Sequence, residues 1–262
     1  MNLNINAGNF TIELLLDVIP NILRNVSIRD FPAVALVCQK WKEILDDKSF
    51  QENLTEINGP RRWNEYTNGD VGEAPPLPKE FFKLMRKGDY MLTFIPEEVK
   101  IKTEDGMDII VPIDSLKNIG ELFAKTINGR QISFSKNSWS AALQEKRPPR
   151  KGYWVLISKN ALGRSKNYDG QVKEAKDKGA KVSDLIDTVI SLFMEYLRTG
   201  EKYFIWDPPQ NGLRTWVRVN DQTQNLRLGL GFVASGLDVG RCTDDDTPDC
   251  LAFAPARKSI ET

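Results

Sequence analysis

The run Leu36-Val-Cys-Gln-Lys-Trp41, read with Phe10-Thr-Ile-Glu-Leu-Leu-Leu-Asp-Val-Ile19 before it, is the most informative part of this sequence. Apolar residues in and around the run recur at steps of three and four, the pattern of an amphipathic helix: Val34, Val37, Cys38, Trp41, Ile44 and Leu45. In the earlier segment Thr11 can cap a helix, and Pro20 is expected to break or kink it. The sequence therefore predicts a small helical module over residues 1–58.

Together the two blocks resemble an F-box, a small helical module that docks onto the Skp adaptor of cullin–RING ubiquitin ligases. A module of about 45 residues barely supports its own core, so it can leave apolar side chains exposed until a partner covers them. Tryptophan and clustered leucines suit the apolar centre of such an interface. The resemblance implies an adaptor-binding surface formed by Phe10, Glu13, Leu14, Leu15, Val18, Leu36, Val37, Cys38 and Trp41.

The sequence departs from the usual F-box pattern at three places. Thr11 stands where the family usually has proline, and Pro20 falls where the family continues its helix. Between the two blocks the chain has about four more residues than usual, which is about one helical turn and keeps the helical faces aligned. The alternative is an N-terminal helical bundle that packs on the rest of the same chain, with Cys38 and Trp41 in its core.

The rest of the chain has a different character. Residues 59–79 are rich in Gly and Pro and are interpreted as a linker. From residue 80 to residue 262, strand-like runs mix with helical runs without strict alternation, which favours an α+β domain with a mainly antiparallel sheet. The clearest helix is predicted over Ser183–Thr199, with Ser183 as its N-cap and Gly200 as its stop.

Four segments of this second part are similar to an uncharacterised domain found in F-box-bearing proteins of chlamydia-like bacteria that infect amoebae. They begin at Trp154, Arg198, Thr215 and Gly229. This resemblance brings no known activity. It implies a bacterial effector that imitates a eukaryotic adaptor-binding module and works in the host cytoplasm.

Composition excludes several classes of chemistry. The chain has 36 Lys and Arg, 36 Asp and Glu, and no histidine. The absence of histidine removes Ser-His-Asp and Cys-His catalysis and His-ligated zinc. A neutral chain does not suggest a nucleic-acid partner. The sequence shows no apolar run long enough for a membrane span and no signal peptide, so we expect a cytoplasmic protein without membrane contact. We also expect no cofactor and no metal.

Three local patterns resemble known chemical sites but lack features that those sites require. Gly229-Leu-Gly-Phe-Val-Ala234 fits a dinucleotide-binding pattern, but glycines after it oppose the required helix, so a strand with close-packed glycines is expected. Asp244-Asp-Asp246 lacks the spacing of a calcium loop and is interpreted as a solvated acidic turn. Cys242 and Cys250 could pair only in an oxidising compartment.

These observations predict a substrate receptor without catalytic residues. Its helical module would dock on the Skp adaptor of a cullin complex, and residues 80–262 would recruit an unknown target protein. Two alternatives remain open at this point. One is an enzyme with a histidine-free pocket in residues 80–262, and the other is an interaction or structural protein whose N-terminal helices pack in cis.

Overall fold

The structure, a computed structural model, describes residues 57–259 apart from residues 79, 82–83, 85–88, 104, 125, 128, 137, 139, 149, 206–214, 224–225 and 247–249. The chain divides into two units, Met1–Thr55 and Glu56–Thr262, and everything below concerns the second. The predicted N-terminal helical module lies outside the described residues except for Ile57 and Asn58. These two residues form a short strand of the second unit, so the predicted boundary at residue 58 lies too far along the chain. No helix in the described part is long and apolar enough to cross a membrane.

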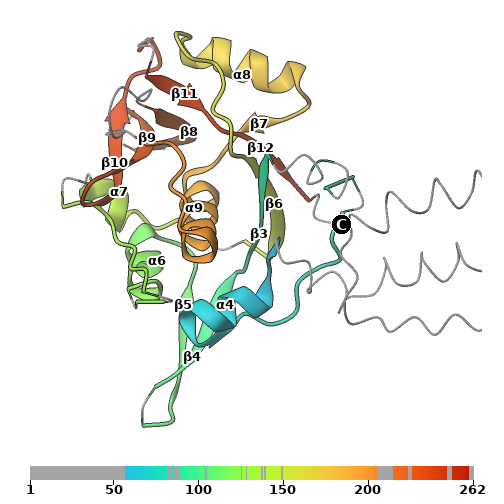
Figure 1. The fold of residues 1–262 in the computed structure, drawn as a ribbon, viewed down its shortest axis with the longest axis vertical. Coiled ribbons are helices and arrows are strands. Elements are labelled where there is room, and N and C mark those ends of the chain that lie inside the picture. Colours follow the sequence, from blue (N-terminus) through green and yellow to red (C-terminus); the bar gives the residue numbers. More distant parts are fainter. Residues whose placement is uncertain are drawn as a thin grey trace, which may run out of the picture. The chain divides into compact units, whose positions relative to one another are not determined.

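The second unit contains helices and strands in mixed order (Figure 1). The helices are α4 (Pro60–Thr67), α6 (Leu116–Leu122), α7 (Ser140–Gln144), α8 (Tyr168–Asp177) and α9 (Leu185–Thr199). The strands are β1 (Ile57–Asn58), β2 (Gly69–Asp70), β3 (Tyr90–Ile95), β4 (Glu98–Lys102), β5 (Asp108–Pro112), β6 (Tyr153–Ser158), β7 (Lys181–Val182), β8 (Trp216–Thr223), β9 (Leu226–Val233), β10 (Gly236–Cys242), β11 (Leu251–Phe253) and β12 (Pro255–Lys258).

In the part of the chain that the structure describes, the strands form three sheets. A five-stranded sheet has the order β1-β3-β6-β12-β7, a four-stranded sheet the order β10-β9-β8-β11, and a three-stranded sheet the order β2-β4-β5. Pairing is antiparallel except between β1 and β3 and between β11 and β8. The predicted α+β class with mainly antiparallel sheets is therefore confirmed for the part of the chain that the structure describes.

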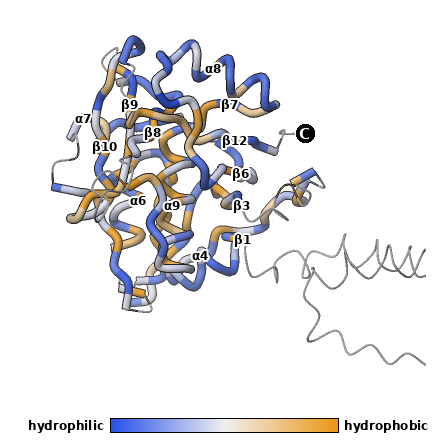
Figure 2. Tube along the Cα trace, turned by 45° about the horizontal axis from the view of Figure 1, so that its top comes forward, coloured by the Kyte–Doolittle hydropathy of each residue, from blue (hydrophilic) through white to orange (hydrophobic). Residues whose placement is uncertain are grey.

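Helix α9 forms the centre of this unit. It contacts β3, β6 and β8, and nearly all of its side chains are buried, as expected for a helix that is apolar on most of its circumference. Figure 2 shows strongly hydrophobic segments in the interior and a largely hydrophilic α8 at the margin. The predicted helix is confirmed, although its N-cap is Asp184 rather than Ser183. Gly200 ends it with a left-handed φ of 81°, a conformation that glycine adopts without strain.

The prediction of a linker over residues 59–79 was wrong for its first half. Residues 60–67 form helix α4, and Trp63 within it is fully buried. The indole Nε1 of Trp63 donates a hydrogen bond to the carbonyl oxygen of Phe94, at 2.8 Å, and its ring packs on Phe123. Pro60 was interpreted as part of a linker, but proline suits the first turn of a helix as well as a loop. Residues 71–78 lie in no helix or strand.

Candidate functional site

The residues predicted to bind the adaptor all lie outside the described part of the chain. They are Phe10, Glu13, Leu14, Leu15, Val18, Leu36, Val37, Cys38 and Trp41. Their assignment stays a prediction. The described residues instead contain a charged cluster that the sequence reading did not single out.

Six charged side chains gather around the first turn of α9. The carboxylates are Asp184, Asp187 and Asp221, and the cations are Arg147, Arg150 and Lys258. They come from the start of α9, from β8, from the segment before β6 and from β12. The N-terminus of a helix carries a partial positive charge, which favours carboxylates at this end. The cluster therefore joins four parts of the chain that are distant in sequence.

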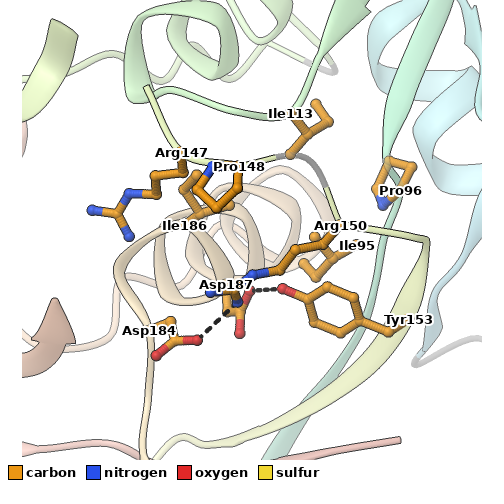
Figure 3. A pocket seen from close by; sticks show the side chains of 10 residues that line it. All are labelled: Ile95, Pro96, Ile113, Arg147, Pro148, Arg150, Tyr153, Asp184, Ile186 and Asp187. Carbon is orange, nitrogen blue, oxygen red and sulfur yellow. Dashed lines mark hydrogen bonds and ion pairs between the residues drawn. The ribbon is translucent and has the colours of Figure 1, made fainter. Parts of the chain in front are cut away.

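Asp187 is the buried member of this cluster, with 1% of its surface exposed. The hydroxyl of Tyr153 donates a hydrogen bond to its Oδ1 atom (Figure 3). The ammonium nitrogen of Lys258 lies 2.7 Å from its Oδ2 atom, although outside hydrogen-bond geometry, so this contact is a Coulombic pair. Burial raises the pKa of the Asp187 carboxyl, and Lys258 offsets part of that rise.

Asp184 has a more open and more polar environment. It accepts hydrogen bonds from Lys258, from Arg150 at 3.1 Å and from the side-chain amide of Asn220 at 3.2 Å. Burial alone would raise the pKa of Asp184, but the charge of Lys258 and the hydrogen bonds from Lys258, Asn220 and Arg150 together lower it. Two carboxylates on the same helical turn thus have pKa values shifted in opposite directions.

Asp221 caps the helix that Asp184 begins. The Asp184 side chain makes no capping hydrogen bond, and the backbone N–H of Leu185 donates instead to the carboxylate of Asp221. Arg147 forms an ion pair with the same carboxylate. Burial lowers the pKa of the Arg147 guanidinium. A residue of β8 therefore performs a task that the sequence reading assigned to Ser183.

The cluster borders a small depression (Figure 3). Its lining consists of Ile95, Pro96, Ile113, Pro148 and Ile186 together with Arg147, Arg150, Tyr153, Asp184 and Asp187. Its volume is about 20 Å³, which is room for roughly one water molecule. Pockets that bind small molecules usually measure about 300–1,000 Å³. Burial also raises the pKa of the Tyr153 phenol, so it stays protonated at neutral pH. A site of this size, with its charged groups paired to one another, can hold a water molecule and fix the start of α9.

A second buried charge lies near the other end of α9. Glu195 is fully buried and accepts two hydrogen bonds from Arg198, at 2.8 and 3.1 Å. Lys159, which follows β6, lies 2.9 Å from its Oε1 atom, and the side-chain amide of Asn58 donates to it at 3.5 Å. Asp187 and Glu195 both interrupt the apolar sequence of α9. An acid inside an apolar helix is the signal by which sequence reasoning could have found both.

The glycine motif in β9 has the structural role that was expected for it. A Cβ atom added at Gly229 would lie 2.0 Å from the indole Nε1 of Trp216, and one at Gly240 would lie 2.9 Å from the same ring. Gly229 and Gly240 are directly paired across β9 and β10. The glycines therefore make room for Trp216 on the face of the sheet, and the prediction of a strand with close-packed glycines is confirmed.

The acidic turn at residues 244–246 is held by two arginines. Arg218 is fully buried and donates to the carbonyl oxygens of Thr243 and Asp246, at 3.0 and 2.7 Å. Arg227 forms an ion pair with Asp244, which is exposed to solvent. The described Cys242 and Cys250 are free thiols. Among the described residues, no group of three or more Asp, Glu or Cys side chains is placed to hold a metal ion.

Comparison with known protein families identifies a partner-binding module. Residues 13–53 match the F-box domain. The matched span includes every predicted adaptor-binding residue except Phe10. F-box domains bind the Skp adaptor, and F-box proteins are typically non-catalytic, so the match supports a role as an F-box adaptor of a ubiquitin ligase. No curated protein and no solved structure matches the chain.

Proposed function

We propose that the chain is a substrate receptor of a Skp–cullin–RING ubiquitin ligase, in which residues 13–53 dock on the Skp adaptor and the unit from Glu56 onward holds a target. The observation that carries this proposal is the F-box match, which agrees with the pattern of apolar residues quoted for the two N-terminal blocks. Within that match, Leu14, Leu36 and Trp41 are proposed to be the main apolar contacts with the adaptor.

The mechanism is scaffolding. Binding at two interfaces holds a lysine of the target near a ubiquitin-loaded enzyme and so raises its effective concentration. No side chain of this chain needs to react. A receptor of this kind needs a rigid second unit. The hydrogen bonds and ion pairs at both ends of α9 support rigidity because they tie the helix to β1, β6, β8 and β12.

Copurification tests this proposal in a eukaryotic extract. The full chain should recover the Skp adaptor and a cullin, whereas Trp41→Ala and Leu14→Asp should recover neither. Val172→Asp, which places a charge at an exposed position of α8, serves as the matched control and should recover both. Failure of the unaltered chain to recover the adaptor would contradict the proposal.

The location of the protein is also part of the proposal. The resemblance of the second part to a domain of chlamydia-like bacteria supports an effector that acts in the cytoplasm of a eukaryotic host. To test this, the chain is fused to a reporter and expressed in an infecting bacterium. The proposal predicts that the reporter is found in the host cytoplasm. Retention of the reporter inside the bacteria throughout infection would contradict it.

The enzyme alternative has one observation in its favour, the convergence of Asp184, Asp187 and Lys258 beside a depression. The small volume of that depression favours the receptor over the enzyme. A screen of metabolites by thermal shift separates the two functions. A compound that stabilises the unaltered chain but not Tyr153→Phe would support the enzyme alternative.

The cis-packing alternative concerns residues outside the described part of the chain. Hydrogen exchange distinguishes it from docking. A receptor should show low protection in residues 13–53 alone and high protection when the Skp adaptor is added. Equal, high protection with and without the adaptor would support helices that pack on their own chain.

A further inference from the structure

The β4–β5 hairpin carries the largest group of exposed apolar side chains in the described residues. Met107, Ile109 and Ile110 are 61%, 47% and 54% exposed. Strand β5 lies at the edge of the sheet with the order β2-β4-β5, and the tip of the hairpin projects from the rest of the unit (Figure 1). Ile109 and Ile110 are consecutive residues of β5, so their side chains lie on opposite faces and this edge is apolar on both. Exposed apolar side chains of this kind often mark an interaction site.

The backbone hydrogen bonds of the hairpin show which groups of β5 face outward. Thr103 donates to the carbonyl oxygen of Met107, and Ile113 donates to that of Glu97, so Met107 and Ile113 face β4. Groups alternate along an antiparallel strand, which places the N–H and C=O groups of Asp108 and Ile110 on the outer edge. An extended peptide is the ligand that such an edge fits, because it supplies matching donors and acceptors.

The open edge is limited to the outer half of β5. The carbonyl oxygen of Pro112 accepts a hydrogen bond from the side-chain amide of Asn118 in α6, at 3.1 Å. Proline has no N–H to offer at that position. An added strand would therefore pair with Asp108 and Ile110 and would be stopped at Pro112.

Other edges of the described sheets are short or covered. On the outer side of β10, Leu237 is bonded by Ser133 and Ser135 and the N–H of Val239 by the Ser138 hydroxyl. On that of β11, Phe253 is bonded by Leu162. The edge strands β1, β2 and β7 are two residues long. Proteins usually cover, shorten or charge their sheet edges to prevent unwanted pairing. The outer edge of β5 differs in being both apolar and open.

We propose that the outer edge of β5 binds an extended segment of a target protein by strand addition, with a basic side chain opposite Asp108 and apolar side chains opposite Ile109 and Ile110. Among the described residues Asp108 forms no ion pair, even with Lys102, its cross-strand partner on β4. Its charge is therefore available to a cation on an added strand. The role of the bound segment as a ligase target rests on the function proposed above.

A second copy of this chain fits the edge less well. Antiparallel pairing of two β5 strands centred on Ile109 sets Asp108 opposite an isoleucine, and pairing centred on Asp108 sets two carboxylates opposite each other. Pairing centred on Ile110 sets Asp108 opposite Pro112, where Asn118 covers the edge. No central register supplies a cation to Asp108, and like charges directly opposite are destabilising.

Two synthetic peptides test the proposal with the full chain. One is Ser-Thr-Val-Val-Lys-Val-Thr-Ser, and its twin has Glu in place of Lys. The unaltered chain should bind the Lys peptide about twofold to fivefold more tightly than the twin in a fluorescence anisotropy titration. Asp108→Lys should invert this preference, which a misfolded variant could not do.

A second variant tests the backbone contribution. Ile110→Pro removes an outward N–H donor and leaves the bonds of Ile109 and Val111 to β4, so both peptides should bind about fivefold more weakly or worse. Val172→Ser, which changes an exposed apolar residue of α8, is the matched control and should bind both peptides as the unaltered chain does.

Three results would overturn the proposal. They are the absence of binding to either peptide at about 1 mM, equal binding by Ile110→Pro, and a dimer of the unaltered chain that Ile110→Pro converts to a monomer. The last would assign the edge to a second copy. Binding of the Skp adaptor is measured in parallel, because Asp108→Lys should leave it unchanged, so failure at the edge and failure of the adaptor function are distinguishable.

Discussion

The hydroxyl of Tyr153 donates a hydrogen bond to the buried carboxylate of Asp187, which links β6 to the first turn of α9 across 34 residues of sequence. Lys258 approaches the other oxygen of the same carboxylate from β12. A buried carboxylate that loses a partner retains the free-energy cost of its desolvation. The link between Tyr153 and Asp187 is therefore expected to contribute to stability.

Removal of the Tyr153 hydroxyl tests this link. Tyr153→Phe should lower the free energy of unfolding by about 1.5–3 kcal/mol, the usual value of a hydrogen bond to a charged group. Urea denaturation measures the change. Tyr168→Phe is the control, because that hydroxyl bonds to Asn220 at the surface and should matter less. Equal effects of the two substitutions would contradict the assignment.

The raised pKa of Asp187 predicts a dependence of stability on pH. The unfolded Asp187 carboxyl loses its proton near about pH 4, whereas the folded carboxyl keeps its proton to a higher pH. Protonation of Asp187 therefore favours the folded state, and this contribution to stability is lost as pH rises through the folded pKa. Asp187→Asn removes the contribution. The difference in unfolding free energy, unaltered chain minus variant, should therefore fall with rising pH, by at most about 1.4 kcal/mol per pH unit.

Urea denaturation at a series of pH values measures this difference. Asp184 has its pKa shifted the other way, so its contribution is lost as pH falls, but it is present in both proteins. Asp245→Asn changes an exposed acid and serves as the control. A difference that stays flat above about pH 5 would show that Asp187 titrates like an ordinary carboxyl.

The position of Trp63 predicts that the first part of residues 59–79 is structural. Trp63→Ala should lower the free energy of unfolding of the second unit by about 3–5 kcal/mol, because a fully buried aromatic is lost. Glu65→Ala, at an exposed position of the same helix, should change it by less than about 0.5 kcal/mol. A negligible effect of Trp63→Ala would restore the linker interpretation.

The contact between Gly229 and Trp216 predicts an overpacking penalty. Gly229→Ala should lower the unfolding free energy by about 1–3 kcal/mol, since its new methyl group would overlap the indole. Trp216→Phe in the same chain should recover part of this loss, and a double-mutant cycle measures the coupling. Additive effects of the two substitutions would show that overlap with the Trp216 indole does not cause the loss of stability.

The sequence could predict the elements whose own pattern is strong. Helix α9 has a long apolar face with a glycine stop, and a strand was expected at the glycine motif that begins with Gly229, where the structure has β9. Strand β4 was missed although Glu98-Val-Lys-Ile-Lys102 alternates in polarity, which is a signal of a half-buried strand. Strand β10 was not predicted, and the glycines in it were used only as an argument against a helix.

The charged cluster could not be predicted because it depends on tertiary contacts. The cluster draws on four separate segments of the chain, and no local pattern indicates that they converge. They contain Arg147 and Tyr153, Asp187, Asp221, and Lys258. A buried acid within an apolar helix indicates only that a partner exists. The adaptor-binding surface is the opposite case, since a local pattern in residues 13–53 was sufficient to suggest it.

Titration of the full chain with purified Skp adaptor in a calorimeter measures the docking step itself. The unaltered chain should release or absorb heat with a stoichiometry near one and a dissociation constant at or below about 1 μM, and Trp41→Ala should give none while the second unit keeps its unfolding transition. An unaltered chain that gives no heat at micromolar concentrations would contradict the account.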